Sequence, residues 1–269
     1  MYIFKSCKAI IVLFACAIVV ACAPSQQKTE YINHQVNQII GGQDLSQSAT
    51  LNRSVVMILN QNNVGSASIC TGTFISPTII LTAAHCVSDD KNDLIVQMGN
   101  SIFSEQEMIS FRVVNVKKHE KYQKTENDLA LILVEESKTV SVIPVAMAKE
   151  KDLSSKKMIT LLGFGVNEIE ESDDEFQGAG NLRSLKVSPS RVSIDHFTFS
   201  VDQSVGSGAC HGDSGGPAFV PSSDRRFILV GVASGVVQSE DEADCSNLAV
   251  YTKVHFYKSW ILKSIQELK

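Results

Sequence analysis

The chain has 269 residues, of which 44% are hydrophobic and 20% charged, and its formal net charge is −5. This length is ample for a hydrophobic core and allows one or two domains. The acidic balance argues against nucleic acid as a partner.

Residues 1–21 have the features of an export signal, because lysines precede an apolar run, 9–20, that is short for a membrane span. The segment Val19-Val20-Ala21-Cys22 resembles a bacterial lipobox, so we expect Cys22 to be lipidated and to anchor the protein to a membrane. By the same resemblance, Ala23 after the cysteine favours the outer membrane of a Gram-negative cell. The alternative is an ordinary secretory signal that contains an incidental cysteine.

Beyond the leader, short apolar runs separated by turn signals predict an all-β barrel or sandwich. Such runs include residues 55–59, 79–82, 94–98, 129–134, 158–164 and 227–233. Near the C-terminus, apolar residues at helical spacing predict a surface helix over about 256–267 that docks by its apolar face. These residues are Phe256, Trp260, Ile261, Ile265 and Leu268.

Four cysteines follow the leader, namely Cys70, Cys86, Cys210 and Cys245. An even number in an exported chain predicts two disulfides in an oxidising compartment, and the sequence alone allows three pairings. A zinc site is the weaker interpretation, because the chain has neither a Cys-x-x-Cys nor a His-x-x-x-His pair. We therefore expect no metal and no cofactor.

The segment Gly212-Asp213-Ser214-Gly215-Gly216-Pro217 places a serine in a glycine-rich turn, where backbone N–H groups can surround a reacting atom. Taken alone, it is equally typical of a loop without chemical importance. A base and a carboxylate elsewhere in the chain must decide between these interpretations.

Leu81-Thr82-Ala83-Ala84-His85-Cys86 supplies a histidine upstream, and Asn127-Asp128-Leu129-Ala130 supplies an aspartate before a buried apolar run. The order histidine, aspartate, serine with these local motifs resembles the trypsin/chymotrypsin family of serine proteases. Further matches are Ile39-Ile40-Gly41-Gly42, Gly163-Phe164-Gly165 and Val250-Tyr251-Thr252-Lys253-Val254. The resemblance covers residues 39–269.

This resemblance implies an all-β fold of two six-stranded antiparallel Greek-key barrels with a C-terminal helix and the active site between the barrels. It implies a domain organisation of a signal peptide (1–21), a lipidated N-terminus and prosegment (22–38) and a protease domain (39–269). The implied activity is that of a serine endopeptidase acting on proteins or peptides. The family pattern pairs Cys70 with Cys86 and Cys210 with Cys245.

The resemblance also assigns roles within the site. His85 is the general base, Asp128 orients and stabilises its imidazole, and Ser214 is the nucleophile. The N–H groups of Gly212 and Ser214 form the oxyanion hole. The Ser234 hydroxyl is expected to bond Asp128, although Ser234 as an ordinary strand or turn serine is nearly as good an interpretation.

Activation of the enzyme is expected to depend on an ion pair between a buried aspartate and the new N-terminus. In the family, an aspartate at the position of Asp213 pairs with the α-ammonium of the mature N-terminus, here Ile39, so the intact chain is expected to be a zymogen. Gln38, rather than arginine or lysine, precedes Ile39. A protease other than a trypsin-like one must therefore cut this bond, or the enzyme cuts itself. The cut would also free the domain from Cys22, as a soluble secreted or periplasmic protease.

The primary specificity pocket departs from the trypsin pattern. Gly208 stands at its base, where arginine- and lysine-cleaving members have aspartate, and Val236 and Ala249 are expected to narrow its walls. We therefore expect an elastase- or chymotrypsin-like preference for small to medium apolar side chains. His211 is expected at the pocket mouth. Alternatively, Asp244 from an inserted acidic loop restores affinity for arginine and lysine.

Two clusters of acidic residues, within 168–175 and 240–244, are expected on loops that rim the site. There they attract basic substrates or a cation, although most such runs are simply solvated. Two other functions compete with the peptidase. One is a non-catalytic binding protein on the same fold, and the other is a surface lipoprotein that stays a zymogen and acts as an adaptor.

Overall fold

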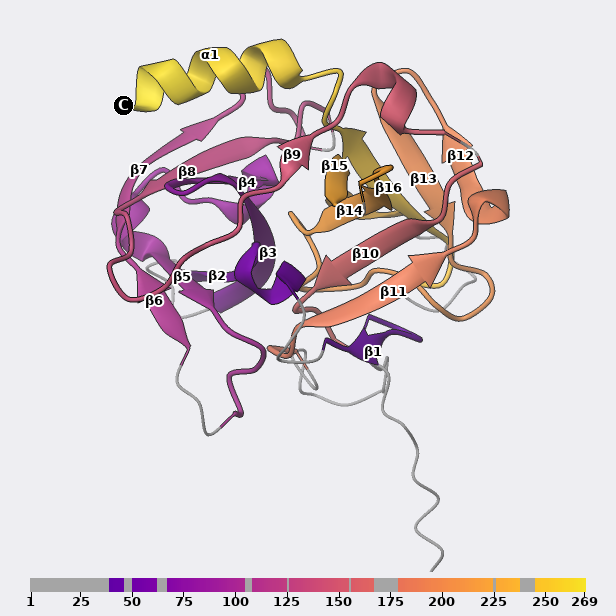
Figure 1. The fold of residues 1–269 in the computed structure, drawn as a ribbon, viewed down its shortest axis with the longest axis horizontal. Helices are drawn as coiled ribbons and strands as arrows, with labels where there is room; N and C mark the ends of the chain where they lie inside the picture. Colours follow the sequence, from indigo (N-terminus) through magenta and orange to yellow (C-terminus); the bar gives the residue numbers. More distant parts are fainter. Residues whose placement is uncertain are drawn as a thin grey trace, which may run out of the picture. The chain divides into compact units, whose positions relative to one another are not determined.

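The computed structural model describes residues 39–45, 50–61, 67–104, 108–124, 126–154, 156–166, 179–224, 226–237 and 245–269. Two curled antiparallel sheets and one C-terminal α-helix make up this part of the chain (Figure 1). The predicted all-β fold class is therefore confirmed. The leader, Cys22, the prosegment, both acidic clusters and Asp244 lie outside the described residues.

The first sheet has the order β6-β5-β2-β3-β4-β8-β7, with antiparallel neighbours throughout. Its strand β4 is buried along its whole length, whereas β5 alternates buried and half-buried residues, as one strand face meets the core. Within the described residues its strands are β2 (Val55–Gln61), β3 (Ala67–Ser76), β4 (Ile79–Thr82), β5 (Leu94–Met98), β6 (Ile109–Phe111), β7 (Val113–Lys118) and β8 (Ala130–Val134).

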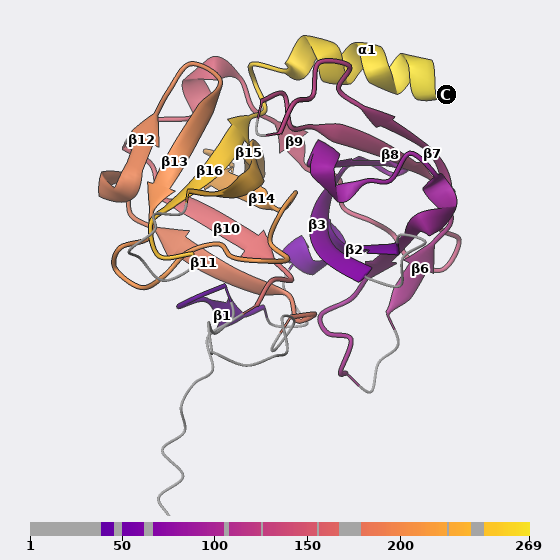
Figure 2. The same cartoon turned by 180° about the vertical axis from the view of Figure 1, so that it is seen from behind.

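The second sheet has the order β1-β11-β10-β14-β15-β16-β13-β12, and β9 pairs in parallel with β15. In the described part of the chain the first sheet thus has seven strands and the second nine, rather than the six predicted for each barrel, because short strands such as β1 and β9 pair with the second sheet. Within the described residues it comprises β1 (Gln43–Asp44), β9 (Ala146–Met147), β10 (Ile159–Gly163), β11 (Arg183–Val187), β12 (Val192–Ile194), β13 (Thr198–Asp202), β14 (Pro217–Pro221), β15 (Phe227–Val237) and β16 (Leu248–Lys253). Figure 2 shows both sheets from behind.

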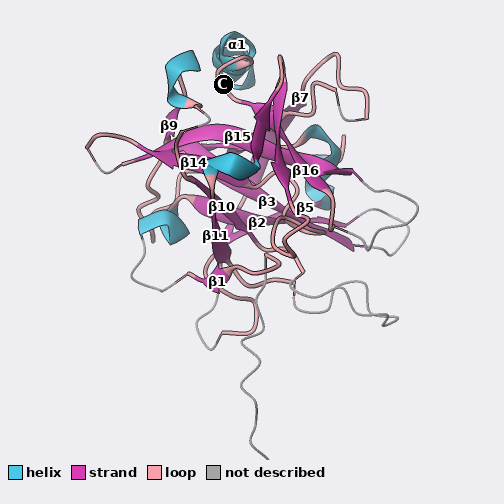
Figure 3. Ribbon diagram, turned by 90° about the vertical axis from the view of Figure 1, so that its right-hand side faces the viewer, coloured by secondary structure: helices cyan, strands magenta, loops and turns pink. Residues whose placement is uncertain are grey.

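Helix α1 (Lys258–Leu268) follows the last strand of the second sheet but packs against β7 and β8 of the first (Figures 1 and 3). Ile261 and Leu268 are buried in the core, with Trp260 and Ile265 packed against it. The predicted apolar face is thus confirmed. The helix begins two residues later than predicted, and Phe256 is an exposed residue of the preceding turn.

Short 3₁₀-helices complete the described elements: η1 (Thr50–Arg53), η2 (Ala84–Cys86), η3 (Lys91–Asp93), η4 (Glu150–Asp152) and η5 (Pro189–Arg191). In the described part of the chain, no helix has the length and apolar character needed to span a membrane.

The largest core cluster joins the two sheets. It includes Leu81 and Leu131 of the first sheet together with Phe219 and Val232 of the second. Apolar packing of this kind is the main favourable contribution to folding and resists changes in volume. The ends of β4, β8 and β14 are therefore held in a fixed relation, and the candidate site lies at these ends.

Candidate active site

His85 lies in η2, directly after β4, and is braced by the neighbouring disulfide. Both expected disulfides are formed, Cys70 to Cys86 with Cα atoms 5.9 Å apart and Cys210 to Cys245 with Cα atoms 5.3 Å apart. The first disulfide ties η2 to β3. The His85 side chain is 32% exposed, so the disulfide fixes the backbone while the ring stays accessible.

Asp128 immediately precedes Leu129 and β8, and it is fully buried. The pairing of Thr82 with Ala130 brings the start of β8 beside the end of β4, and thus Asp128 beside His85. One carboxylate oxygen accepts a hydrogen bond from the backbone N–H of His85 at 3.1 Å. The other lies 2.8 Å from His85 Nδ1 and accepts from the Ser234 hydroxyl at 2.6 Å.

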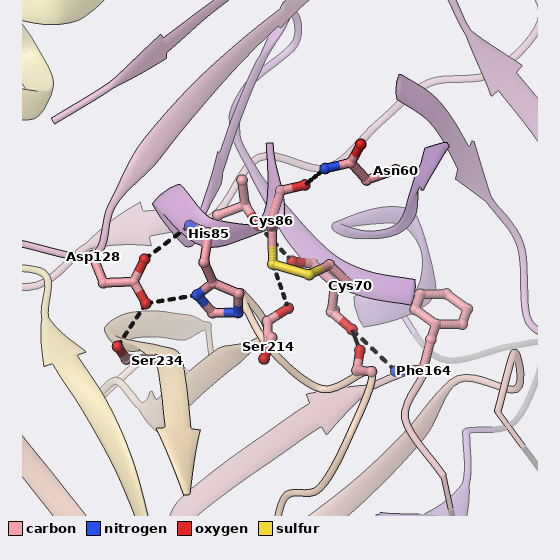
Figure 4. Close-up of a disulfide and its surroundings, with 11 residues drawn as sticks. Asn60, Cys70, His85, Cys86, Asp128, Phe164, Ser214 and Ser234 are labelled. Atoms are coloured by element: carbon pink, nitrogen blue, oxygen red, sulfur yellow. Dashed lines mark hydrogen bonds and ion pairs between the residues drawn. A yellow bond between two sulfur atoms is a disulfide. The ribbon is translucent and has the colours of Figure 1, made fainter. Parts of the chain in front are cut away.

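These contacts satisfy a carboxylate that would otherwise be costly to bury. They also determine the imidazole tautomer, because a carboxylate opposite Nδ1 requires the proton on that nitrogen and leaves Nε2 as the acceptor. Figure 4 shows the ring between Asp128 and Ser214, with its second nitrogen on the side of Ser214. His85 and Ser214 line the same cavity.

The turn that carries Ser214 is attached to both sheets. The Ser214 carbonyl accepts from Thr71 N in β3 at 2.7 Å, and Gly215 N donates to Ala233 O in β15 at 2.7 Å. Backbone hydrogen bonds at these distances are well formed. The serine is therefore positioned by the first sheet and the second together.

Gly212 adopts a φ of +92°, and a side chain there would lie 2.8 Å from the Cα of Gly165. The preceding carbonyl, His211 O, accepts from Val166 N at 2.8 Å. Because a trans peptide points its C=O and N–H in opposite directions, this bond turns the Gly212 N–H away from Val166. Among the described residues, no backbone carbonyl accepts from the N–H of Gly212 or Ser214.

Asp213 is the second buried carboxylate of the site. Its oxygens accept from Gly165 N and Cys210 N, each at 2.9 Å. Burial raises the pKa of Asp213 to about 7, although these backbone hydrogen bonds and the charges of Arg183 and His211 oppose the rise. In the intact chain this carboxylate therefore lacks the stabilisation that a carboxylate needs to stay ionised throughout the neutral range.

The segment that begins at Ile39 is docked on the second sheet. Ile39 is buried in its core cluster, and Gly208 N donates to Ile40 O at 2.9 Å. Further along, Asp44 in β1 pairs with the buried Arg183 of β11. Ile39 has a φ of +38°, which is a strained conformation for a β-branched residue.

The cavity beside Ser214 has a volume of about 280 Å³. Of the residues predicted for the pocket, His211, Val236 and Ala249 line this cavity, Ser234 lines it as well, and Gly208 lies outside the lining. Val236 and Ala249 form a cross-strand pair of β15 and β16, so both walls carry a side chain where a glycine would leave the cavity wider.

Two residues of this region were not predicted from the sequence. Lys124 lines the same cavity as an exposed lysine in the loop before Asp128, and Gln203 lies fully buried next to Gly208. Neither belongs to a motif, and no local pattern distinguishes them from other lysines and glutamines.

Two groups of potential metal ligands lie close together, Cys70 with His85 and Cys86, and Cys210 with His211 and Cys245. All four sulfurs are bound in disulfides and cannot coordinate as thiolates. Each group therefore offers a single imidazole.

Two antiparallel sheets that bring a histidine, a buried aspartate and a serine to one cavity are typical of serine hydrolases. The model of the Trypsin family matches residues 39–261 of this chain. The chain therefore belongs to the trypsin family of serine proteases.

Three animal proteins are similar to this chain. Vitamin K-dependent protein C of Oryctolagus cuniculus is 26% identical over 219 residues, which cover 74% of this chain and 47% of that protein. Trypsin 5G1 of Aedes aegypti is 25% identical over 262 residues, covering 92% of this chain and 93% of that protein. Serine proteinase stubble of Drosophila melanogaster is 27% identical over 216 residues, covering 73% of this chain and 27% of that protein. The chain thus spans about half of protein C but almost all of trypsin 5G1.

Proposed function

We propose that this chain is a serine endopeptidase in which Ser214 attacks the peptide carbonyl, His85 transfers the proton and Asp128 orients and stabilises the imidazole. The observation that carries the proposal is the buried Asp128 carboxylate, which meets both His85 and Ser234 while His85 and Ser214 line one cavity. Family membership supports the same chemistry.

The proposed reaction has two halves. The Ser214 oxygen bonds to the carbonyl carbon as its proton passes to His85 Nε2, and the C–N bond then breaks as His85 gives that proton to the leaving amine. Water next attacks the acyl-enzyme by the same proton route and releases the acid. The N–H groups of Gly212 and Ser214 would stabilise the oxyanion in both halves, and the orientation of the His211–Gly212 peptide supports this role.

The chain is further proposed to be a zymogen. Cleavage before Ile39 creates an α-ammonium, which would pair with the buried Asp213 carboxylate and stabilise its ionised form against the burial that raises its pKa. Cleavage also removes the constraint on the φ of Ile39, because a terminal amine has no preceding peptide. The activating protease must accept Gln38 before the cut bond.

The proposed substrates have small to medium apolar side chains before the scissile bond. This preference is supported by Gly208 in place of an acid and by the narrowing pair of Val236 and Ala249. Cleavage after arginine or lysine is the alternative, and it requires a carboxylate such as Asp244 to reach the pocket.

The proposed location rests on the leader. A signal over residues 1–21 followed by Cys22 supports export and attachment to the outer membrane as a lipoprotein, with release into the periplasm or medium on cleavage before Ile39. An active species still joined to residues 23–38 would contradict this coupling of activation with release.

The test is labelling with a fluorophosphonate, which reacts with an activated serine. In the full-length chain, Gln38→Arg allows trypsin to cut before Ile39 and leaves the same mature N-terminus. We expect strong labelling after the cut, loss of labelling in Ser214→Ala, and weak labelling of the uncut chain. No labelling after confirmed cleavage would instead support a non-catalytic binding protein or a lipoprotein adaptor.

A further inference from the structure

Gln203 directly follows β13 and is fully buried. Its backbone is anchored, since its N–H donates to Asn247 O at 2.7 Å and its carbonyl accepts from Gly206 N at 2.9 Å. A buried amide is stable only if its polar atoms find partners. One partner of this amide, Ala209, lines the cavity beside Ser214, and the other, Cys245, is bonded through its disulfide to Cys210, which also lines the cavity.

The Gln203 Oε1 accepts from Ala209 N at 2.6 Å, and Nε2 donates to Ala209 O at 3.0 Å and to Cys245 O at 2.5 Å. Ala209 directly precedes Cys210, which forms the disulfide with Cys245. The amide is therefore a second, non-covalent tie between the segments that the disulfide joins. Both of its N–H groups and its oxygen are engaged within the protein.

The same side chain occupies the space next to Gly208. A Cβ at position 208 would lie 2.0 Å from Gln203 Oε1 and 2.1 Å from its Cδ. Real Cβ atoms do not approach other atoms so closely, so any side chain at position 208 must displace an amide that makes three buried hydrogen bonds. Gly208 and Gln203 are thus a coupled pair.

We infer that Gln203 determines the substrate specificity of the pocket, by holding its walls together and by filling the place of an acidic residue at position 208 with a neutral, internally paired amide. This inference rests on the proposed peptidase function. A cationic substrate side chain would meet this neutral amide rather than a carboxylate at position 208, at a high desolvation cost. The substrates are therefore peptides with uncharged side chains small enough for the narrowed cavity.

The first experiment measures selectivity in the processed enzyme. In Gln203→Ala the base of the pocket opens, so the ratio of kcat/KM for a peptide with phenylalanine before the cut to one with alanine should rise on the order of tenfold. Merely structural damage would lower both values together. Gln97→Ala, in β5 of the other sheet, is the matched control and should leave the ratio unchanged.

Gln203→Asn provides a second variant in case Gln203→Ala does not fold, because it keeps the amide and shortens the side chain by one methylene. The ratio should move in the same direction. A labelled, folded variant with an unchanged ratio would overturn the inference while leaving the proposed function intact.

The second experiment does not depend on catalysis. In the Ser214→Ala background, binding of the aromatic amidine 4-aminobenzamidine is followed by fluorescence and unfolding by Tm. Gly208→Asp alone should lower the Tm and bind no probe, because its side chain overlaps the Gln203 amide. Gln203→Ala with Gly208→Asp should recover Tm and bind the probe, a non-additive result expected of residues in contact.

A Gly208→Asp chain that binds the probe with an unchanged Tm would overturn the coupling. If the Gln38→Arg chain is not labelled by the fluorophosphonate after cleavage before Ile39, the proposed function fails, and the substrate claim fails with it. The Tm and probe measurements would still decide whether Gln203 excludes a side chain at position 208.

Discussion

Asp128 and Asp213 are both buried aspartates within the same site, yet their surroundings differ. Asp128 meets two side chains and one backbone N–H, whereas the hydrogen bonds shown for Asp213 come from two backbone N–H groups. Burial raises the pKa of Asp213 to about 7. The comparison teaches that the contacts around His85 and Asp128 are complete, while the Asp213 carboxylate is only partly stabilised against its burial, by two backbone N–H groups and the charges of Arg183 and His211.

The largest effect, a loss of kcat, is expected from substituting Asp128, whose carboxylate holds the His85 imidazole. In processed Asp128→Asn, the amide would donate to His85 Nδ1 and force the proton onto Nε2, so the imidazole could no longer accept the Ser214 proton. We expect kcat to fall on the order of 10⁴-fold, the size known for this change in Ser-His-Asp proteases. Peptide hydrolysis measures it, and Asp89→Asn, an exposed position, should keep full activity.

The second-largest effect is the pH dependence of stability that the buried Asp213 carboxyl should cause. The pKa of Asp213 is 3.8 in an unfolded chain and about 7 in the folded one. Between these two pH values the folded intact chain keeps the Asp213 proton that the unfolded chain releases. The free energy of unfolding of the intact chain should therefore fall as pH rises through this window, by up to about 4 kcal/mol. Urea unfolding of full-length Ser214→Ala at several pH values measures this slope.

Other groups titrate in that window. Burial lowers the pKa of His119 and His255, and such histidines make stability rise with pH. The difference between Ser214→Ala and Ser214→Ala with Asp213→Asn isolates the carboxyl, because asparagine does not ionise. Equal slopes in the two chains would mean that Asp213 keeps an ordinary pKa and needs no new cation.

The features of the fold and the site that could be predicted from the sequence are those that depend on local patterns. The strands and the motifs around His85, Asp128 and Ser214 can be predicted because each depends on residues close together in the sequence. Such local predictions hold when the tertiary packing agrees with them. The start of α1 was placed two residues early because Phe256 matches the helical spacing. Its ring instead packs on Phe197 and His196 at the surface, and the helix starts after this turn.

Gln203 and Lys124 could not be predicted, for a different reason. Their roles depend on which backbone segments return to the pocket, and this is a property of the tertiary arrangement rather than of neighbouring residues. Gln203 meets Ala209 and Cys245 only because β13 pairs with β16 and the disulfide brings the two segments together. Gly208 was predicted to lie at the base of the pocket, but it lies outside the lining of the cavity, and the Gln203 side chain fills the space next to it.

A smaller effect should distinguish the Asp128 contacts from one another. Ser234→Ala removes one hydrogen bond to the carboxylate but leaves that to His85, so kcat should fall about tenfold, corresponding to the loss of one such bond. Ser264→Ala is a matched control, since this buried hydroxyl of α1 has no hydrogen-bond partner among the described residues. A loss as large as in Asp128→Asn would mean that Ser234, rather than His85, holds the carboxylate in place.

The smallest effect is expected at Lys124, where the first sheet adds a charge to a cavity whose other walls come mainly from the second. Lys124 is exposed, so water and salt screen its attraction for a substrate. Lys124→Ala should lower kcat/KM about two- to threefold for peptides with an acidic residue near the cut, relative to neutral peptides. The difference should vanish in about 1 M salt, and Lys263→Ala on α1 should not produce it. An effect that persists in high salt would instead mean that the lysine contacts the substrate directly.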